Sequence, residues 1–132
     1  MDLFAHSVEE KAESAWEPLA HHLSAVGARA AEFAEYFNAG TMARAMGLLH
    51  DIGKCSDAYQ RYIRRPRDKA GPKGPDHSSA GAREACARYG PWGRLMAFGL
   101  AGHHAGLMDG SGHDGSALPQ RLAKSVQDYA GW

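Results

Sequence analysis

Apolar residues recur every three or four positions over most of the chain, which is the spacing of one face of an α-helix. The clearest run lies between Glu17 and Phe37. Its apolar positions are Leu19, Leu23, Val26, Ala30, Phe33 and Phe37, and the acidic positions on its opposite side are Glu17, Glu32 and Glu35. This pattern predicts one long amphipathic helix.

Glycine, proline and capping residues divide the rest of the chain into shorter predicted helices. Ser7 and Glu10 have the spacing of a capping box, which marks a helix start. A helix is predicted at 42–49, with a cap at Thr41 and an end near Gly53. A short helix is predicted from Ser56 onward, with Tyr59 and Ile63 facing inward. Three more are predicted at 78–89, from Pro91 to about 104, and at 119–130.

The segments 64–76 and 105–117 are predicted loops, because glycine and proline interrupt regular structure there. No segment of useful length alternates with the two-residue period of a strand. We therefore predict an all-α fold, a helical bundle formed by a single domain over residues 1–132. The large side chains expected in its core are Trp16, Phe33, Trp92 and Phe98.

Charge and composition exclude several classes of protein. The chain has 15 basic and 15 acidic residues and a pI near 7.1, so any affinity for nucleic acid must come from a local patch, a metal or a partner. The amino terminus lacks a basic signal region, and the longest apolar run is too short to cross a membrane. We expect a cytoplasmic protein with no membrane contact, in which Cys55 and Cys86 are reduced thiols.

Histidine carries most of the chemical information, with eight residues in 132. Helical geometry places His22 roughly 60° from the centre of its apolar stripe and His21 about 160° away, and it places His103 within about 20° of the next stripe. An imidazole buried without a partner costs roughly 1–3 kcal/mol. A backbone carbonyl can satisfy one such ring, but several on successive helices favour convergence on a transition metal.

The stretch "MGLLHDIGK" ends an apolar helix with His50, Asp51, Gly53 and Lys54. Together with His22 on an earlier helix, this arrangement resembles the HD phosphohydrolase superfamily. Two further pairs, Asp76-His77 and His103-His104, make the chain similar to one branch of it, the HD nuclease domain of the CRISPR type I helicase-nuclease. The resemblance extends from about Phe4 to Leu107.

The resemblance implies two metal sites that share Asp51. His22, His50 and Asp51 would hold the first ion, and Asp51, His77, His103 and His104 would hold the second. It implies one or two divalent transition ions, namely Mn, Ni, Co or Fe in preference to Mg or Zn. Lys54 would reach a phosphate oxygen or the leaving group.

The same resemblance implies hydrolysis of single-stranded DNA in CRISPR antiviral interference, with the surveillance complex and a helicase as partners. One departure is that the family carries a further aspartate ligand downstream of the His-His pair. Asp109, Asp114 and Asp128 are the remaining acidic candidates. We expect a first ion held by three protein ligands and water, in a chain that ends early and has no helicase region.

A basic segment follows the predicted Ser56 helix. Its cations are Arg61, Arg64, Arg65, Arg67, Lys69 and Lys73. They are consistent with a track for a DNA strand, because phosphate contacts do not depend on sequence, or with a solvated loop. Tyr59 and Tyr62 are candidate platforms for base stacking.

Two other functions stay open on the sequence alone. A nucleotide phosphohydrolase of the same superfamily would need a closed base pocket, and a shortened module would bind partners without catalysis. His6 and His113 are expected to be structural or surface residues. Ser78 and Ser79 are expected to cap a helix, because no base can be assigned to activate either as a nucleophile.

Overall fold

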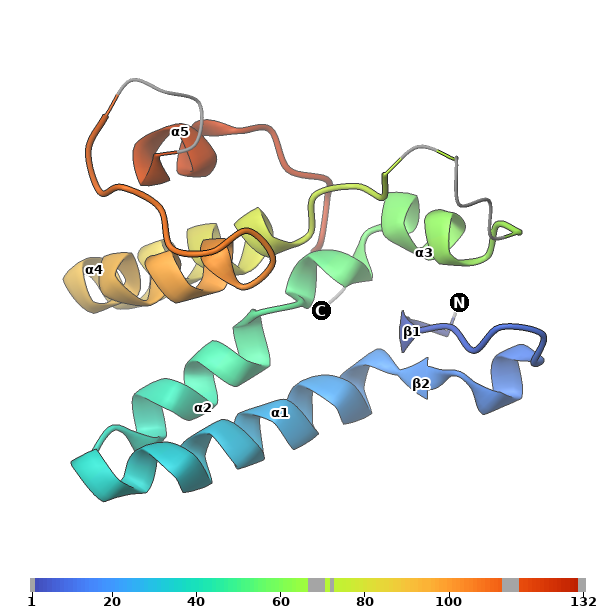
Figure 1. Cartoon of the computed structure of the whole chain (residues 1–132), viewed down its shortest axis with the longest axis horizontal. Helices are drawn as coiled ribbons and strands as arrows, with labels where there is room; N and C mark the ends of the chain where they lie inside the picture. Colours follow the sequence, from blue (N-terminus) through green and yellow to red (C-terminus); the bar gives the residue numbers. More distant parts are fainter. Residues whose placement is uncertain (1, 67–70, 72, 113–116, 131–132) are drawn as a thin grey trace.

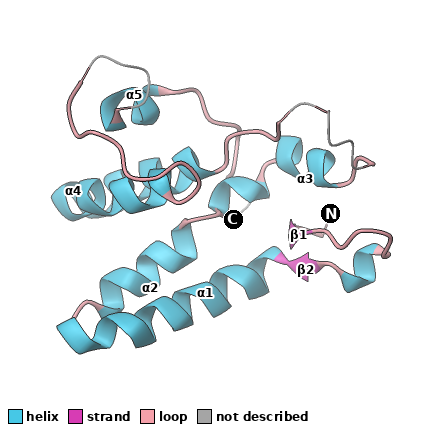
Figure 2. Ribbon diagram, in the orientation of Figure 1, coloured by secondary structure: helices cyan, strands magenta, loops and turns pink. Residues whose placement is uncertain are grey.

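The computed structural model describes residues 2–66, 71, 73–112 and 117–130. This part of the chain is mostly helical, which confirms the predicted fold class (Figures 1 and 2). The helices are α1 (Leu19–Ala34), α2 (Gly40–Leu49), α3 (Asp57–Ile63), α4 (Ser78–Gly102) and α5 (Leu118–Ala123), with short 3-10 turns η1 (Glu13–Ala15), η2 (Glu35–Phe37) and η3 (Ile52–Cys55). None of these described helices combines the length and apolar character needed to cross a membrane.

The first 18 residues differ from the prediction. Two short strands, β1 (Phe4–His6) and β2 (Glu17–Pro18), pair antiparallel, with His6 opposite Glu17. Ser7 and Glu10 do not begin a helix, because Glu10 has a left-handed backbone with φ 59°. Strands this short give no alternating pattern that a sequence could reveal.

The helices α1 and α2 form an antiparallel hairpin whose backbones approach closely (Figure 1). A Cβ atom added to Gly47 would lie 2.6 Å from the Cα of Gly27. Asn38, in the left-handed conformation with φ 56°, reverses the chain between the two helices. Because α2 ends at Leu49, the hairpin carries the next residues toward the first turn of α1.

The helix α4 consists of two arms that fold back on each other. Gly90, with φ 53° and ψ −123°, breaks the helix just before Pro91. This is the boundary predicted between the helix at 78–89 and the helix that begins at Pro91. The Arg121 guanidinium of α5 donates to the Ser78 hydroxyl at 3.0 Å and to the Ala101 carbonyl at 3.1 Å. One side chain therefore contacts the start of the first arm and the end of the second, so both ends of α4 lie together.

The helix α5 is shorter than predicted. Lys124 is extended, with ψ 143°, and ends it. Beyond that point the chain follows α4, since Arg83 donates to the Lys124 carbonyl at 3.0 Å and the Tyr129 hydroxyl lies 3.3 Å from Glu84. These contacts replace the helical hydrogen bonds that the sequence pattern predicted for 124–130.

The core lies between the α1–α2 hairpin, η3 and the second arm of α4. Its largest fully buried apolar side chains are Leu19, Ile52, Leu100 and Leu118. Two predicted core residues are wrong: Phe33 is 60% exposed at the far end of α1, and Trp92 is 65% exposed beside the α4 break. Phe98 packs against the core, and Trp16 is half-buried.

Asp76 supplies the cap for α4. Its carboxylate accepts from the Ser79 backbone N–H at 3.1 Å, from the Ser79 hydroxyl at 2.7 Å and from the Ser78 hydroxyl at 3.2 Å. The prediction that Ser78 and Ser79 cap the helix is wrong: both lie inside α4 and donate their hydroxyls to the carboxylate that caps it. Burial raises the pKa of Asp76, but the hydrogen bonds from Ser79 outweigh burial and lower the pKa below its ordinary value.

We predict that Gly47→Ala destabilises the protein more than Gly27→Ala, by about 1–3 kcal/mol in the free energy of unfolding. The added methyl at position 47 meets backbone at 2.6 Å, whereas at position 27 it meets the backbone and the flexible Leu48 side chain at 3.2 Å. Both changes raise helix propensity equally, so urea unfolding of the pair isolates the contact. Equal stabilities would show that the helices can separate at no cost.

We predict a pH-dependent effect of Asp76→Ala on stability. Since the folded-state pKa of Asp76 lies below the unfolded value of about 3.9, the charged cap stabilises the fold above that pH, and this contribution is lost as pH falls through the folded-state pKa. The variant should lose about 1 kcal/mol near pH 7. Urea unfolding in EDTA should show the difference shrinking below about pH 4; a constant difference would contradict a charged cap.

Candidate metal centre

Asp51 occupies the middle of a cluster of imidazoles. It lies between His50, the residue after α2, and the start of η3, and it is only 3% exposed. Oδ2 of Asp51 faces Nε2 of His22 at 3.4 Å and Nε2 of His50 at 3.2 Å. Oδ1 faces Nε2 of His77 at 3.5 Å and Nε2 of His103 at 3.4 Å. Each carboxylate oxygen therefore points at one pair of histidines.

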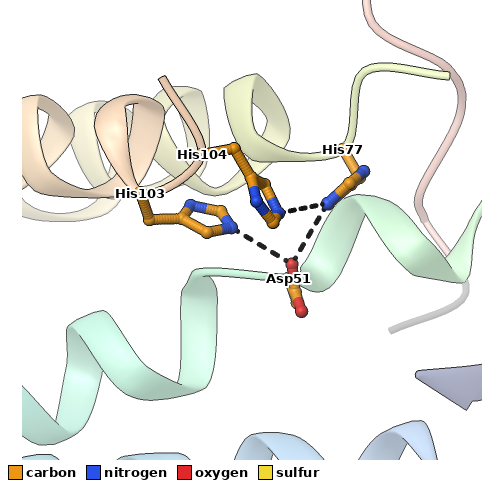
Figure 3. A group of neighbouring side chains, drawn as sticks. All are labelled: Asp51, His77, His103 and His104. Carbon is orange, nitrogen blue, oxygen red and sulfur yellow. Dashed lines mark hydrogen bonds and ion pairs between the residues drawn. The ribbon is translucent and has the colours of Figure 1, made fainter. Parts of the chain in front are cut away.

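The fold explains why these side chains meet. His22 lies in the first turn of α1, and His50 follows the last residue of α2. His77 precedes the first arm of α4, and His103 and His104 follow the second arm, so the break at Gly90 returns the chain to its starting point. Figure 3 shows these three side chains converging on Asp51 from the two ends of α4.

The structure brings all the predicted metal ligands together in the predicted two sets. One set is His22, His50 and Asp51, and the other is Asp51, His77, His103 and His104. Within each set the ligand atoms lie within 4.8 Å of one another. The shared member of both sets is Asp51, whose carboxylate can offer one oxygen to each ion.

Backbone carbonyls orient three of the rings. Nδ1 of His50 lies 2.7 Å from the Gly47 carbonyl, Nδ1 of His103 lies 2.7 Å from the Leu100 carbonyl, and Nδ1 of His77 lies 3.3 Å from the Pro75 carbonyl. A carbonyl only accepts, so each Nδ1 carries the proton. In the neutral ring the Nε2 lone pair then faces Asp51, which is the arrangement of a metal ligand.

Two features of the cluster are incomplete without an added proton or metal ion. Nε2 of His22 lies 3.1 Å from Nε2 of His50. Nδ1 of His22 faces the Glu17 carboxylate and so also carries a proton, which leaves two Nε2 lone pairs in contact unless a proton or metal ion lies between them. Oδ1 of Asp51 is buried without a hydrogen-bond partner among the described residues. The donor set therefore fits a bound metal.

The electrostatics of the cluster also suit metal binding. Burial raises the pKa of the Asp51 carboxyl, but the side chains of His103, His50 and Lys54 that face it outweigh burial and hold the pKa far below its ordinary range. Burial lowers the pKa of His77 and of His104. At neutral pH the carboxylate is ionised and these two rings are neutral, which are the forms that bind metal.

The environment of His50 is different. Burial lowers its pKa, but the hydrogen bond and charge of Asp51 outweigh burial and raise the pKa overall. His104 completes the second set, with Nε2 2.9 Å from Nε2 of His77. Here one ring can donate to the other, so this contact is compatible with a proton as well as with a metal.

Lys54 lies inside the protein, with only 3% of its surface exposed. Its Nζ donates to Oδ2 of Asp51 at 2.8 Å and to the Ala5 carbonyl at 3.1 Å. To touch a phosphate, as the sequence suggested, Nζ would have to leave both partners. The structure therefore gives Lys54 a different contact from the predicted one, since it neutralises and orients Asp51.

The predicted basic track is only partly available. Arg61, Arg65 and Lys73 are exposed, whereas Arg67 and Lys69 lie outside the described residues. The Arg64 guanidinium pairs with Glu13 at 2.9 Å and donates to the Asp2 carbonyl at 3.0 Å, so we omit it from the track.

The tyrosines of α3 are not open stacking platforms. Tyr59 is buried, and its hydroxyl donates to the Ala5 carbonyl at 3.2 Å. Its ring lies 5.2 Å from that of His77, which joins α3 to the metal centre. Tyr62 is half-buried and lies against Tyr59 and the backbone of Gly74. The stacking prediction is therefore wrong for Tyr59.

The two described acidic candidates for a further ligand do not reach the centre. Neither Asp109 nor Asp128 belongs to a potential metal-binding group among the described residues, and Asp114 lies outside them. The sequence analysis missed Glu17, whose Oε2 lies 3.2 Å from Nδ1 of His22. Helical periodicity could not find it, because Glu17 belongs to β2 and not to the helix that carries His22.

Comparison with known proteins identifies the family but not the branch. The family model of the HD domain matches residues 19–128, a range that contains every member of the two ligand sets. A search of the curated proteins found no match. The family match does not distinguish the CRISPR nuclease from other HD proteins. Together with the paired His/Asp sets, it shows that the chain belongs to the HD domain family, as a metal-dependent phosphohydrolase-type hydrolase.

Proposed function

We propose that this protein hydrolyses phosphodiester bonds of single-stranded DNA in CRISPR antiviral interference. The observation that carries the proposal is that the two carboxylate oxygens of Asp51 face different pairs of histidines. Oδ2 faces His22 and His50, and Oδ1 faces His77 and His103. This arrangement suits two ions that share one carboxylate. Two-ion sites are typical of enzymes that cleave phosphodiesters.

The protein residues have distinct tasks in this proposal. His22 and His50 would hold the first ion, His77, His103 and His104 the second, and Asp51 both. When bound, such ions lower the pKa of water and offset charge on the phosphate. Imidazole-rich ligand sets favour Mn, Fe, Co or Ni over Mg. Lys54 keeps the Asp51 carboxylate ionised and fixed between the sets.

The surroundings of the centre favour a polymer over a free nucleotide. His103 and His104 are exposed, so the centre opens to solvent. A cavity of about 770 Å³ lies elsewhere, lined by Leu3, Trp16, Leu23 and neighbouring residues, and contains none of the metal ligands. Because no described metal ligand lines this cavity, it cannot hold a base beside the centre. This is consistent with a strand that passes across an open surface.

Exposed cations on and after α3 support an anionic polymer as the substrate. Arg61 lies in the last turn of α3, the helix whose Tyr59 contacts His77. Arg65 follows the same helix, and Lys73 precedes His77 in the chain. Contacts from these side chains to phosphates would be independent of sequence and sensitive to salt. The surveillance complex and a helicase are the proposed sources of opened single-stranded DNA.

We predict that EDTA-treated protein reloaded with Mn²⁺ or Ni²⁺ cleaves single-stranded DNA, leaves free nucleotides intact, and cuts the matching duplex more slowly. Asp51→Ala is the control and should reduce cleavage to background, because it removes a ligand from both ions. Gel assays of labelled DNA and chromatography of nucleotides measure the outcome. Faster hydrolysis of nucleotides would indicate a nucleotide phosphohydrolase, cleavage that survives Asp51→Ala would exclude this centre, and inactivity despite two bound ions would indicate a non-catalytic module.

We also predict how ligand changes affect bound Mn²⁺. His22→Ala should remove the first ion and keep the second, His77→Ala should weaken the second and keep the first, and Asp51→Ala should lose both. Elemental analysis after gel filtration measures ions per chain, with the exposed, non-cluster His21→Ala as the matched control. If Asp51→Ala lost no more metal than His22→Ala, the shared carboxylate would be contradicted.

A further inference from the structure

We infer that Glu17 is a positioning residue that holds His22 ready for the first ion. Its Oε2 lies 3.2 Å from Nδ1 of His22, while Nε2 of the same ring faces His50 at 3.1 Å and Asp51 at 3.4 Å. The inference rests on the two-ion centre of the proposed function. It does not depend on which phosphodiester the centre cleaves.

Glu17 differs from the other orienting groups in the cluster. His50, His77 and His103 direct their Nδ1 atoms at backbone carbonyls, whereas His22 directs its Nδ1 at the carboxylate of a side chain. A carboxylate acceptor makes a stronger hydrogen bond than a neutral carbonyl. It also makes the ring a better electron donor to a metal at Nε2. Among these four rings, only the orientation of His22 can be removed by a single side-chain substitution.

The local fold holds Glu17 in place. It belongs to β2, opposite His6 of β1, and the Leu19 N–H donates to the Leu3 carbonyl at 2.9 Å. Pro18 is extended, with φ −64° and ψ 136°, and α1 begins after it. The chain therefore leaves a paired strand and enters a helix, which sets Glu17 back against the first helical turn. This accounts for the contact between Glu17 and His22, which are five positions apart in the sequence and belong to different elements.

The first ligand set has most need of such support. It contains three protein ligands, whereas the second set contains four. When one imidazole of three turns away, two donors remain. Losing the orientation of His22 should therefore weaken the first ion strongly and leave the second ion unchanged. Loss of a partner that orients a metal-binding histidine typically costs about 10- to 100-fold in metal affinity.

His6, Glu17 and His22 are also close enough to form a separate metal-binding group. Two observations favour positioning. Nε2 of His6 lies 3.8 Å from Oε2 of Glu17, beyond hydrogen-bond distance, and the His6 side chain is 54% exposed. A ring that bound one ion through Nδ1 and another through Nε2 would also have to lose both protons, whereas the Glu17 contact needs the Nδ1 proton in place.

The test compares Glu17→Ala, Glu17→Gln and His6→Gln in the full chain. Competition between Mn²⁺-loaded protein and a chelator gives the affinity of each ion. Nitrogen-15 NMR of the histidine rings in the Zn²⁺-loaded protein reports which nitrogen of His22 carries the proton. We expect Glu17→Ala to weaken the first ion about 10- to 100-fold and to disturb the His22 tautomer. Glu17→Gln, whose amide oxygen still accepts, should lose less, and His6→Gln should change neither measurement.

Each alternative has a distinct result. First-ion affinity within about twofold of wild type in Glu17→Ala would overturn the inference, as would a loss of thermal stability with unchanged affinity and tautomer. Loss of an additional ion in His6→Gln would assign the trio as a separate site instead. If the wild-type protein bound no first ion, the proposed two-ion function would fail. Normal binding with inactive protein would leave the Glu17 inference standing.

Discussion

The structure depends on one buried carboxylate. Asp51 is almost wholly enclosed, and removing an ionised group from water is unfavourable unless it is paired. Lys54 compensates the charge directly at 2.8 Å, and four imidazole nitrogens surround the remaining directions. These partners come from the start of α1, the end of α2 and both ends of α4. Satisfying this one carboxylate, by Lys54 directly and by the cations that the imidazoles would hold against it, would thus fix the relative placement of most helices in the described part of the chain.

Close backbone contacts make this convergence possible. Gly47 lets α2 approach α1 at Gly27, and Gly53 brings η3 against the backbone of His77, where an added Cβ would lie 2.6 Å from the His77 Cα. A larger residue at either contact would separate elements that carry ligands. Interiors are densely packed, so such a separation would move the side chains of the centre and not merely their surroundings. The glycines and Asp51 therefore act together, because the glycines permit the close approach of backbones that brings the ligands to Asp51.

Helical periodicity predicted what depends on local sequence, and little beyond it. It placed His22 inward and His21 outward, and the Gly90-Pro91 pair marked the α4 break correctly. It missed the β1–β2 pairing and the enclosure of Lys54, because both depend on contacts with residues far away in the chain. The apolar pattern also placed Phe33 in the core, although Phe33 is 60% exposed. Periodicity gives the direction of a side chain, but burial requires a second surface.

The composition of the centre links metal choice to substrate. Its single carboxylate is already neutralised by Lys54, and the other donors are imidazoles, which bind metal in their neutral form. The protein therefore contributes almost no negative charge to offset bound divalent ions. A centre rich in carboxylates would hold Mg²⁺ firmly and cancel its charge, whereas under the proposed function this one would hold softer transition ions and leave their charge for an anion. The phosphodiester of the proposed substrate would meet that need, which would let a chain with no net charge attract an anionic polymer at one point.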